Sequence, residues 1–190
     1  KWNLARFAEC LIPLINDDKN TGVKIATEIV NSFSEIYQKN WFEMMRKKLG
    51  LIREDSKDEK LIIDLLTWMH KKKADYTNTF CFLMNQNFKE KKIYSDESFL
   101  YWKKQWQDRL KINSNSFEES LKLMRSNNPL VIPRNHKVEE ALDSANNGDL
   151  NPTKNLLKIL EKPYEDKKEI NEYQLSVPPN NKIYKTFCGT

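Results

Sequence analysis

Bulky apolar residues recur every three or four positions through most of this chain, the spacing that places them on one face of an α-helix. The pattern is clearest between residues 21 and 49, where it runs through Ile25, Ile29, Phe33, Ile36, Tyr37, Trp41, Met44 and Met45. No stretch alternates convincingly between apolar and polar residues as a β-strand does, and the 190 residues include only four glycines. We therefore predict an all-α fold of helices joined by polar segments.

Local sequence signals predict where several of these helices begin and end. Gly50 is expected to end the helix over residues 21–49, because glycine readily adopts the left-handed conformation that follows a helix. The stretches Ser56–Glu59 and Ser116–Glu119 have the spacing of capping boxes, which predicts a helix start at each. The other expected N-caps are Asp75, Ser95 or Asp96, and Asn151, which is followed by Pro152.

The last third of the chain is expected to be less regular. Pro129 and Pro133 favour a loop over residues 128–136, because each proline holds the residue before it extended. A helix is expected from Val138 to Ala145, closed near Gly148. Beyond residue 163 the chain is charged and then proline-bearing, so we expect residues 164–190 to form a tail laid over a surface.

The first segment, residues 2–15, is apolar on most of its circumference, with only Asn3, Arg6 and Glu9 as a polar edge. A helix of this kind belongs inside a larger structure. It also begins without a capping residue. We therefore expect that part of its natural cover lies outside this chain.

Composition excludes several classes of protein. No apolar run approaches the roughly 20 residues that a membrane-spanning helix requires, so we expect no membrane partner. Lys and Arg total 32 against 27 Asp and Glu, a net charge of +5 that favours solvated helix faces over a nucleic-acid surface. Three cysteines at unrelated spacings do not make a disulfide scaffold and suit a reducing compartment.

One aromatic stripe leaves two interpretations open. Phe99, Trp102, Trp106 and Leu110 lie on one helical face, with Lys103 and Lys104 beside the tryptophans. Tryptophans flanked by lysines could stack on bases while the lysines contact phosphates, as in an RNA-binding module. Four bulky groups on one face are more often core, and we favour that interpretation.

Residue types alone point to no catalytic centre. His70 and His136 have no Cys or His partner at a zinc-binding spacing, and no glycine-rich phosphate loop occurs. Cys10 and Cys81 lie in apolar helical segments and are expected to be buried. Cys188, two positions from the end, is expected to be accessible, although by itself it is no more than an incidental surface thiol.

An ordered set of motifs changes this interpretation. The set is WNLARFAE from Trp2, KLGL from Lys48, DYTNTF from Asp75, Trp102 with Arg109-Leu110, NPLVIPRNHKVEEAL from Asn128, Gly148-Asp149, Leu156-Leu157 to Pro163-Tyr164, Tyr173, Pro178-Pro179 and FCGT from Phe187. In this order and spacing the chain resembles the C-terminal portion of the selenoprotein O / YdiU family of pseudokinase adenylyltransferases. The resemblance covers essentially the whole chain.

The resemblance implies a kinase-like parent that uses ATP and a divalent metal, Mg or Mn, to transfer AMP to Ser, Thr or Tyr hydroxyls of target proteins. UMP transfer is also attributed to some members. The nucleotide- and metal-binding residues of the family lie N-terminal to WNLARFAE, so none can be assigned to this chain, and we expect the fragment alone to be inactive. Its partners would be the missing N-terminal kinase-like domain and the target proteins. We expect a cytoplasmic location in bacteria and a mitochondrial one in a eukaryote.

The same resemblance divides the chain into later helices of a kinase-like C-lobe (1–50), a helical extension (51–163) and an extended tail (164–190). It also implies a role for Cys188, because relatives have a cysteine or selenocysteine at this position. That residue would exert redox control by pairing with a cysteine in the activation loop of the kinase-like domain. The alternative that we keep open is a free-standing helical module that binds protein or RNA without catalysis.

Overall fold

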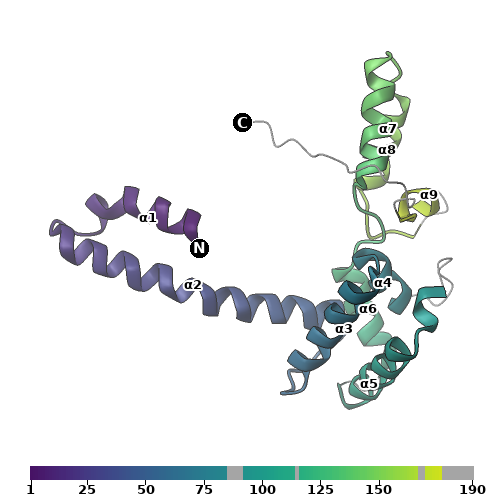
Figure 1. Cartoon of the computed structure of the whole chain (residues 1–190), viewed down its shortest axis with the longest axis horizontal. Helices are drawn as coiled ribbons and strands as arrows, with labels where there is room; N and C mark the ends of the chain where they lie inside the picture. The colour runs from purple at the N-terminus through teal and green to yellow at the C-terminus, as the bar shows by residue number, and fades with distance from the viewer. Residues whose placement is uncertain (85–91, 114–115, 167–169, 177–190) are drawn as a thin grey trace. The chain divides into compact units, whose positions relative to one another are not determined.

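The computed structural model describes residues 1–84, 92–113, 116–166 and 170–176, and these form nine α-helices and one 3-10 helix without a β-strand (Figure 1). The all-α prediction is therefore confirmed for these residues. The helices are α1 Trp2–Ile15, α2 Lys19–Lys48, α3 Asp58–Lys72, α4 Tyr76–Met84, η1 Lys92–Ser95, α5 Glu97–Asn113, α6 Phe117–Asn127, α7 Asn135–Asn146, α8 Asn151–Leu160 and α9 Asn171–Gln174. The chain divides into an N-terminal unit, Lys1–Met45, and a C-terminal unit, Arg46–Thr190.

The N-terminal unit is a pair of helices, in which α1 turns back along α2 (Figure 1). Asp18 makes the turn, because its carboxylate accepts hydrogen bonds from the Thr21 amide at 2.8 Å and the Thr21 hydroxyl at 2.7 Å. Gly22 follows, where a Cβ would lie 3.2 Å from the Ile12 carbonyl oxygen. The missing side chain at residue 22 therefore lets α2 approach α1 closely.

Apolar side chains of α1 remain exposed, and none of its residues is buried. Trp2 is 72% exposed, Phe7 62% and Leu14 83%. Cys10 is also exposed, with its thiol donating to the Arg6 carbonyl at 3.5 Å, so the prediction that Cys10 is buried is wrong. The prediction failed because the helix is apolar on more of its circumference than α2 can cover.

The aromatic stripe of α5 forms the centre of the C-terminal unit. Phe99, Trp102, Trp106 and Leu110 are all buried, so the core interpretation is confirmed. The indole N–H groups are satisfied inside the unit: Trp102 donates to the Leu61 carbonyl at 2.8 Å and Trp106 to the Leu49 carbonyl at 2.9 Å. The two indole rings are consequently unavailable for stacking on nucleic-acid bases.

A buried ion pair joins the start of α3 to α5. The Arg109 guanidinium donates to both carboxylate oxygens of Asp58, at 2.7 and 3.2 Å, and the two side chains are 7% and 1% exposed. Asp58 also accepts a hydrogen bond from the Asp55 amide at 2.9 Å, while Asp55 accepts one from the Lys57 amide at 2.8 Å. These bonds close the turn before α3, which begins at Asp58 with Lys57 as its N-cap and no side-chain cap, so the predicted Ser56–Glu59 capping box is wrong.

Gly50 ends α2 as predicted, with φ of 72°. The Leu51 amide donates to the Arg46 carbonyl at 2.9 Å and the Gly50 amide to the Lys47 carbonyl at 3.1 Å, which is the Schellman pattern. A Cβ at Gly50 would lie 2.8 Å from the Ser120 carbonyl oxygen. Glycine is thus required here both by the backbone conformation and by the close approach of α6.

Other predicted helix starts have mixed outcomes. Asp75, Asp96 and Ser116 each accept a hydrogen bond from an amide in the first turn that follows, so these N-caps are confirmed. The helix expected from Val138 begins earlier, with Arg134 as N-cap and Asn135 as its first residue. The N-cap of α8 is Leu150 rather than Asn151, because Asn151 already has helical geometry and its amide donates to the Asp149 carboxylate at 2.9 Å.

Part of the segment expected as a tail is packed. Ile170, 2% exposed, joins Val131 and Ile159 of α8 in a small apolar cluster. Residues 171–174 form α9 (Figure 1), whose Tyr173 packs against this cluster. Described residues up to 176 therefore belong to the folded C-terminal unit.

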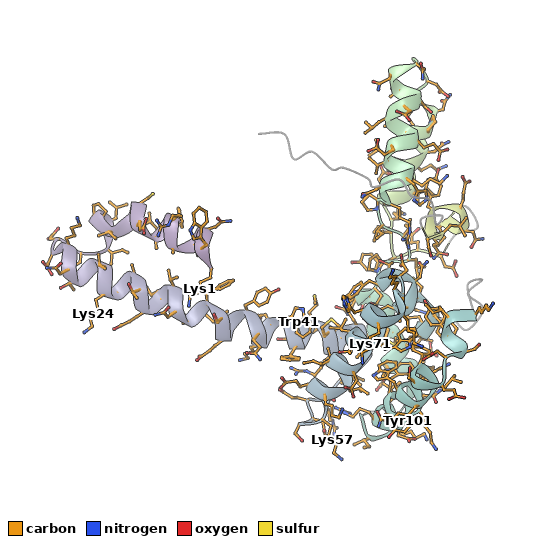
Figure 2. All side chains as sticks on the ribbon, in the orientation of Figure 1. Lys1, Lys24, Trp41, Lys57, Lys71 and Tyr101 are labelled. Carbon is orange, nitrogen blue, oxygen red and sulfur yellow. The ribbon has the colours of Figure 1, made fainter. Side chains whose placement is uncertain are left out.

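The burial of Trp106 yields a test of this core. We expect Trp106→Ala to lower the free energy of unfolding by about 3–5 kcal/mol, because it removes a buried indole and leaves the Leu49 carbonyl without its donor. The control is Tyr101→Ala on the same helix, where the ring is 68% exposed (Figure 2) and the change should be within about 0.5 kcal/mol. Chemical denaturation of wild type and the two variants measures both changes in unfolding free energy. Equal losses in the two variants would contradict the assignment of Trp106 to the core.

Candidate functional site

Cys188, the site residue proposed from the sequence, lies outside the described residues, as does everything beyond residue 176. The described residues that precede it are Gln174, Leu175 and Ser176. Their contacts hold the last described residues of the chain against the rest of the C-terminal unit. The functional site is therefore built from these contacts.

Asn78, in the first turn of α4, holds this point. Its side-chain amide donates to the Gln174 carbonyl at 3.0 Å and to the Ser176 hydroxyl at 3.4 Å, and the residue is fully buried. The Gln174 side chain in turn donates to the Leu130 carbonyl at 2.9 Å. Residues 174–176 are thus fixed to α4 on one side and to the loop before α7 on the other.

Arg134 fixes the orientation of the Asn78 side chain. Its guanidinium donates to the Asp75 carboxylate at 2.6 and 3.1 Å and to the Asn78 side-chain oxygen at 2.9 Å. Asp75 also caps α4 through the Asn78 amide at 2.8 Å. We refer to Asp75, Asn78, Arg134, Gln174 and Ser176 as the anchor cluster. Two of the sequence motifs quoted above, DYTNTF and NPLVIPRNHKVEEAL, meet in it.

The anchor cluster keeps Asp75 ionised. Burial on its own raises the pKa of the Asp75 carboxyl, but the hydrogen bonds from Arg134 and the Asn78 amide, together with the positive charge of Arg134, outweigh burial. The net result is a pKa below the usual value. Arg134 is 7% exposed, and the carboxylate of Asp75 compensates for the burial of its positive charge.

Cys81 lies one turn after Asn78 and has no features of a reactive thiol. It is 2% exposed, which confirms the predicted burial, and its sulfur lies 3.8 and 3.9 Å from the carbonyl oxygens of Pro129 and Leu130. Burial, helped by the negative charge of Asp75, raises the pKa of the thiol to about 12. The nucleophilic thiolate is therefore strongly disfavoured.

Lys48 borders the cluster from the end of α2. Its ammonium group donates to the Asn127 carbonyl at 3.1 Å and lies over the rings of Phe80, at 4.8 Å, and Tyr76, at 5.6 Å. Burial lowers its pKa. The positive charge is nevertheless well placed, since aromatic faces and a carbonyl oxygen both favour a cation.

These contacts give the site a structural character. Asp75, Asn78 and Arg134 bind one another, and within the described ranges no group of three or more His, Cys, Asp or Glu side chains could hold a metal ion. His136 lies beside Arg134, and its pKa is lowered by burial and then by the charges of Lys137 and Arg134. Arg134 therefore packs the loop before α7 against α4, and it is also the N-cap residue of α7.

Sequence reasoning missed the role of Asn78 and of residues 174–176. A signal for Asn78 was present, since it lies three residues after the N-cap Asp75, where a polar side chain is turned back toward the helix start. No comparable signal marks Gln174 or Ser176, because their partners are distant in sequence.

Comparison with known proteins defines the class. Curated relatives named "Protein nucleotidyltransferase YdiU" match the whole chain: one from Pelagibacter ubique is 50% identical, one from Nitrosococcus oceani 44% and one from Clostridium perfringens 45%. In each case the match covers 100% of this chain and 39% of the relative. The chain thus spans well under half the length of these nucleotidyltransferases.

A match to a family model identifies the family of this chain. The model of the family described as "Protein adenylyltransferase SelO" matches residues 1–161. The chain belongs to this family, which confirms the resemblance inferred from the motifs. Within the described residues, no helix is long and apolar enough to cross a membrane.

The depressed pKa of Asp75 predicts a pH dependence. Because the native pKa lies below the unfolded value of about 3.9, ionised Asp75 contributes stability above that pH, and the contribution is lost as pH falls through the native pKa. We expect Asp75→Asn to cost about 2–3 kcal/mol at pH 7, less than a fully buried pair because the Asp75 side chain is 23% exposed. The difference from wild type should shrink toward pH 3.

Urea unfolding at several pH values measures this difference. The control is Asp64→Asn, which removes an exposed pair with Lys60 and should change stability by less than about 0.5 kcal/mol. A wild-type to Asp75→Asn difference that stays constant between pH 7 and pH 3 would contradict the assigned ionisation.

Proposed function

We propose that this chain is the C-terminal helical region of a protein adenylyltransferase, which transfers AMP from ATP to Ser, Thr or Tyr hydroxyls of target proteins and releases pyrophosphate. The observation that carries the proposal is the match of residues 1–161 to the SelO family model. Within the parent, the chain supports the kinase-like domain, contributes surface for target proteins and carries a redox-regulatory cysteine, Cys188.

The residues described here do not fit ATP or its metal ion, Mg or Mn. Gly22 packs against α1, while Gly50 and Gly148 take positive φ after α2 and α7, so none of them forms a loop around phosphates. The described residues also lack a group suited to a metal. We therefore assign nucleotide and metal binding to the rest of the parent and derive no step of the transfer from this chain.

The exposed face of α1 supports the domain-supporting role. A groove of about 500 Å³ lies between α1 and α2, and its lining is mainly apolar: Trp2, Ala5, Ala8, Ile12, Val23, Ala26 and Val30. Phe7 and Leu14 are exposed as well and lie on a different side of α1 from the groove residues, so α1 presents apolar side chains on more than one side. We propose that the kinase-like domain of the parent covers these exposed apolar side chains of α1.

If the kinase-like domain covers α1, a charge introduced on α1 should destabilise the full-length parent more than the 190-residue chain. Phe7→Asp should change the unfolding free energy of the 190-residue chain by less than about 0.5 kcal/mol, because the ring is already exposed. In the full-length parent the same change should cost about 2 kcal/mol or more, since it would bury an unpaired charge. Tyr101→Asp, on the exposed side of α5, is the matched control and should be mild in both proteins. Equal effects of Phe7→Asp in the two proteins would refute the cover.

The transferred group can be identified with labelled ATP. We expect the full-length parent to label proteins with ATP carrying radioactivity in the α-phosphate and not with ATP labelled in the γ-phosphate, because AMP retains only the α-phosphate. The 190-residue chain alone should give no label with either. Labelling from the γ-phosphate would indicate a kinase, and labelling by the isolated chain would overturn the assignment of the nucleotide site to the rest of the parent.

Cys188 is tested in the same assay. We expect transfer by the full-length parent to change between oxidised and reduced glutathione buffers, and Cys188→Ser to remove that response. Cys81→Ser is the control and should leave the response intact, because this buried thiol has a pKa of about 12. A redox response that persists in Cys188→Ser would exclude the proposed regulation while leaving AMP transfer untouched.

A further inference from the structure

A single line of side chains runs along most of α2. Its members recur in alternating steps of three and four residues, the spacing with which one helix packs lengthwise on another. They are Val23, Ala26, Val30, Phe33, Tyr37, Asn40 and Met44, of which only Asn40 is polar. We refer to these seven residues as the α2 seam.

The first half of the α2 seam already has a helical partner. Val23, Ala26 and Val30 line the groove between α1 and α2, and Trp2 of α1 lines the same groove. At the other end of α1, the Ile12 carbonyl oxygen lies against Gly22. The two helices are therefore antiparallel (Figure 1), and the first residues of α1 lie at the level of Val30.

The second half of the α2 seam (Phe33, Tyr37, Asn40 and Met44) extends beyond α1. The reason is length, because α1 has 14 residues and α2 has 30, which correspond to about 21 and 45 Å. Tyr37 is 58% exposed and Met44 42%. Phe33 is half-buried, and its ring contacts that of Tyr37, with 5.7 Å between the centroids. The seam thus continues as an exposed apolar stripe.

We propose that a helix of the parent that precedes Lys1 packs on the second half of the α2 seam, in line with α1. The inference rests on the proposed function, in which the rest of the parent precedes this chain. The curated relatives have the length that this requires, since the match covers only 39% of each of them. It adds to the proposed function a second surface of this chain, on α2, and the kind of segment that it binds.

The direction of α1 favours a segment that directly precedes Lys1. Because α1 is antiparallel to α2, a chain that enters α1 at Trp2 arrives from the side of Phe33 and Tyr37. The polar member of the seam also suits a helical partner. Asn40 donates its side-chain amide to the Ile36 carbonyl at 2.8 Å, and a single Asn in an apolar seam sets the register of the helix that packs on it.

The size of the stripe argues against a second copy of this chain as its occupant. From Phe33 to Met44 the stripe is about 17 Å long, and one helix is about 10 Å wide. A stable interface between separate proteins buries about 800 Å² on each partner, several times this area. A segment joined to α1 needs no such area, because its attachment keeps its effective concentration at the stripe high.

The test uses the full-length parent with the photocrosslinking amino acid p-benzoylphenylalanine in place of Tyr37. After irradiation, we expect mass spectrometry to find residue 37 joined to the segment directly before Lys1 of the same molecule. Mixing parent grown on ¹⁴N with parent grown on ¹⁵N separates links within a molecule from links between two copies. The matched control has the same amino acid in place of Glu35, on the opposite side of α2, and should not link to that segment.

A second measurement needs no substitution and holds if the crosslinking variant does not fold. Hydroxyl radicals should oxidise Tyr37 and Met44 about fivefold more slowly in the wild-type parent than in the 190-residue chain, because oxidation follows exposure. Equal rates, or links from residue 37 to a second copy or to another part of the parent, would overturn the inference while leaving AMP transfer intact. A parent that forms the expected link but labels no protein would refute the transfer and leave the packing on α2 standing.

Discussion

The salt bridge between Arg134 and Asp75 is the interaction on which the meeting of α4, the loop before α7 and residues 174–176 depends. It joins residues 59 positions apart, caps α4 through Asp75 and fixes Asn78, which in turn holds residues 174–176. A buried pair of this kind adds little net stability compared with apolar packing, but removing one partner is costly because the other charge stays buried. Its principal contribution is geometric, since it determines how α4, the loop before α7 and the C-terminal segment meet.

A second pair, Arg109 with Asp58, makes a similar joint between α3 and α5. Aromatic packing holds the rest of the core of the C-terminal unit. Its rings contact one another in sequence: Trp68 with Phe99, Phe99 with Trp102, and Trp102 with Trp106. The N-terminal unit differs, because α1 exposes its apolar side chains. This contrast agrees with a chain whose C-terminal unit completes its own core and whose N-terminal unit is covered by another part of the parent, as proposed.

The helices and most of their ends could be predicted from the sequence, because a periodic apolar face, Gly50 after α2 and Asp75 before α4 act over a few residues. The capping box predicted at Ser56–Glu59 does not form, because the carboxylates of Asp55 and Asp58 accept the backbone hydrogen bonds before α3 and Asp58 also pairs with Arg109, 51 residues away. The prediction that Cys10 is buried was wrong, because the apolar sequence of α1 does not determine which side of the helix is packed against another element. The anchor cluster could not be predicted, since its contacts to residues 174–176 span 96 and 98 positions. The redox role of Cys188 stays a prediction, because this residue lies outside the described residues.

The proposal that this chain belongs to a protein adenylyltransferase is tested by the intact mass of proteins incubated with ATP, a divalent metal and the full-length parent. We expect a mass increase of one AMP per modified site, mapped by fragmentation to Ser, Thr or Tyr. An increase of one phosphate instead, or an unchanged mass under both oxidising and reducing conditions, would contradict it.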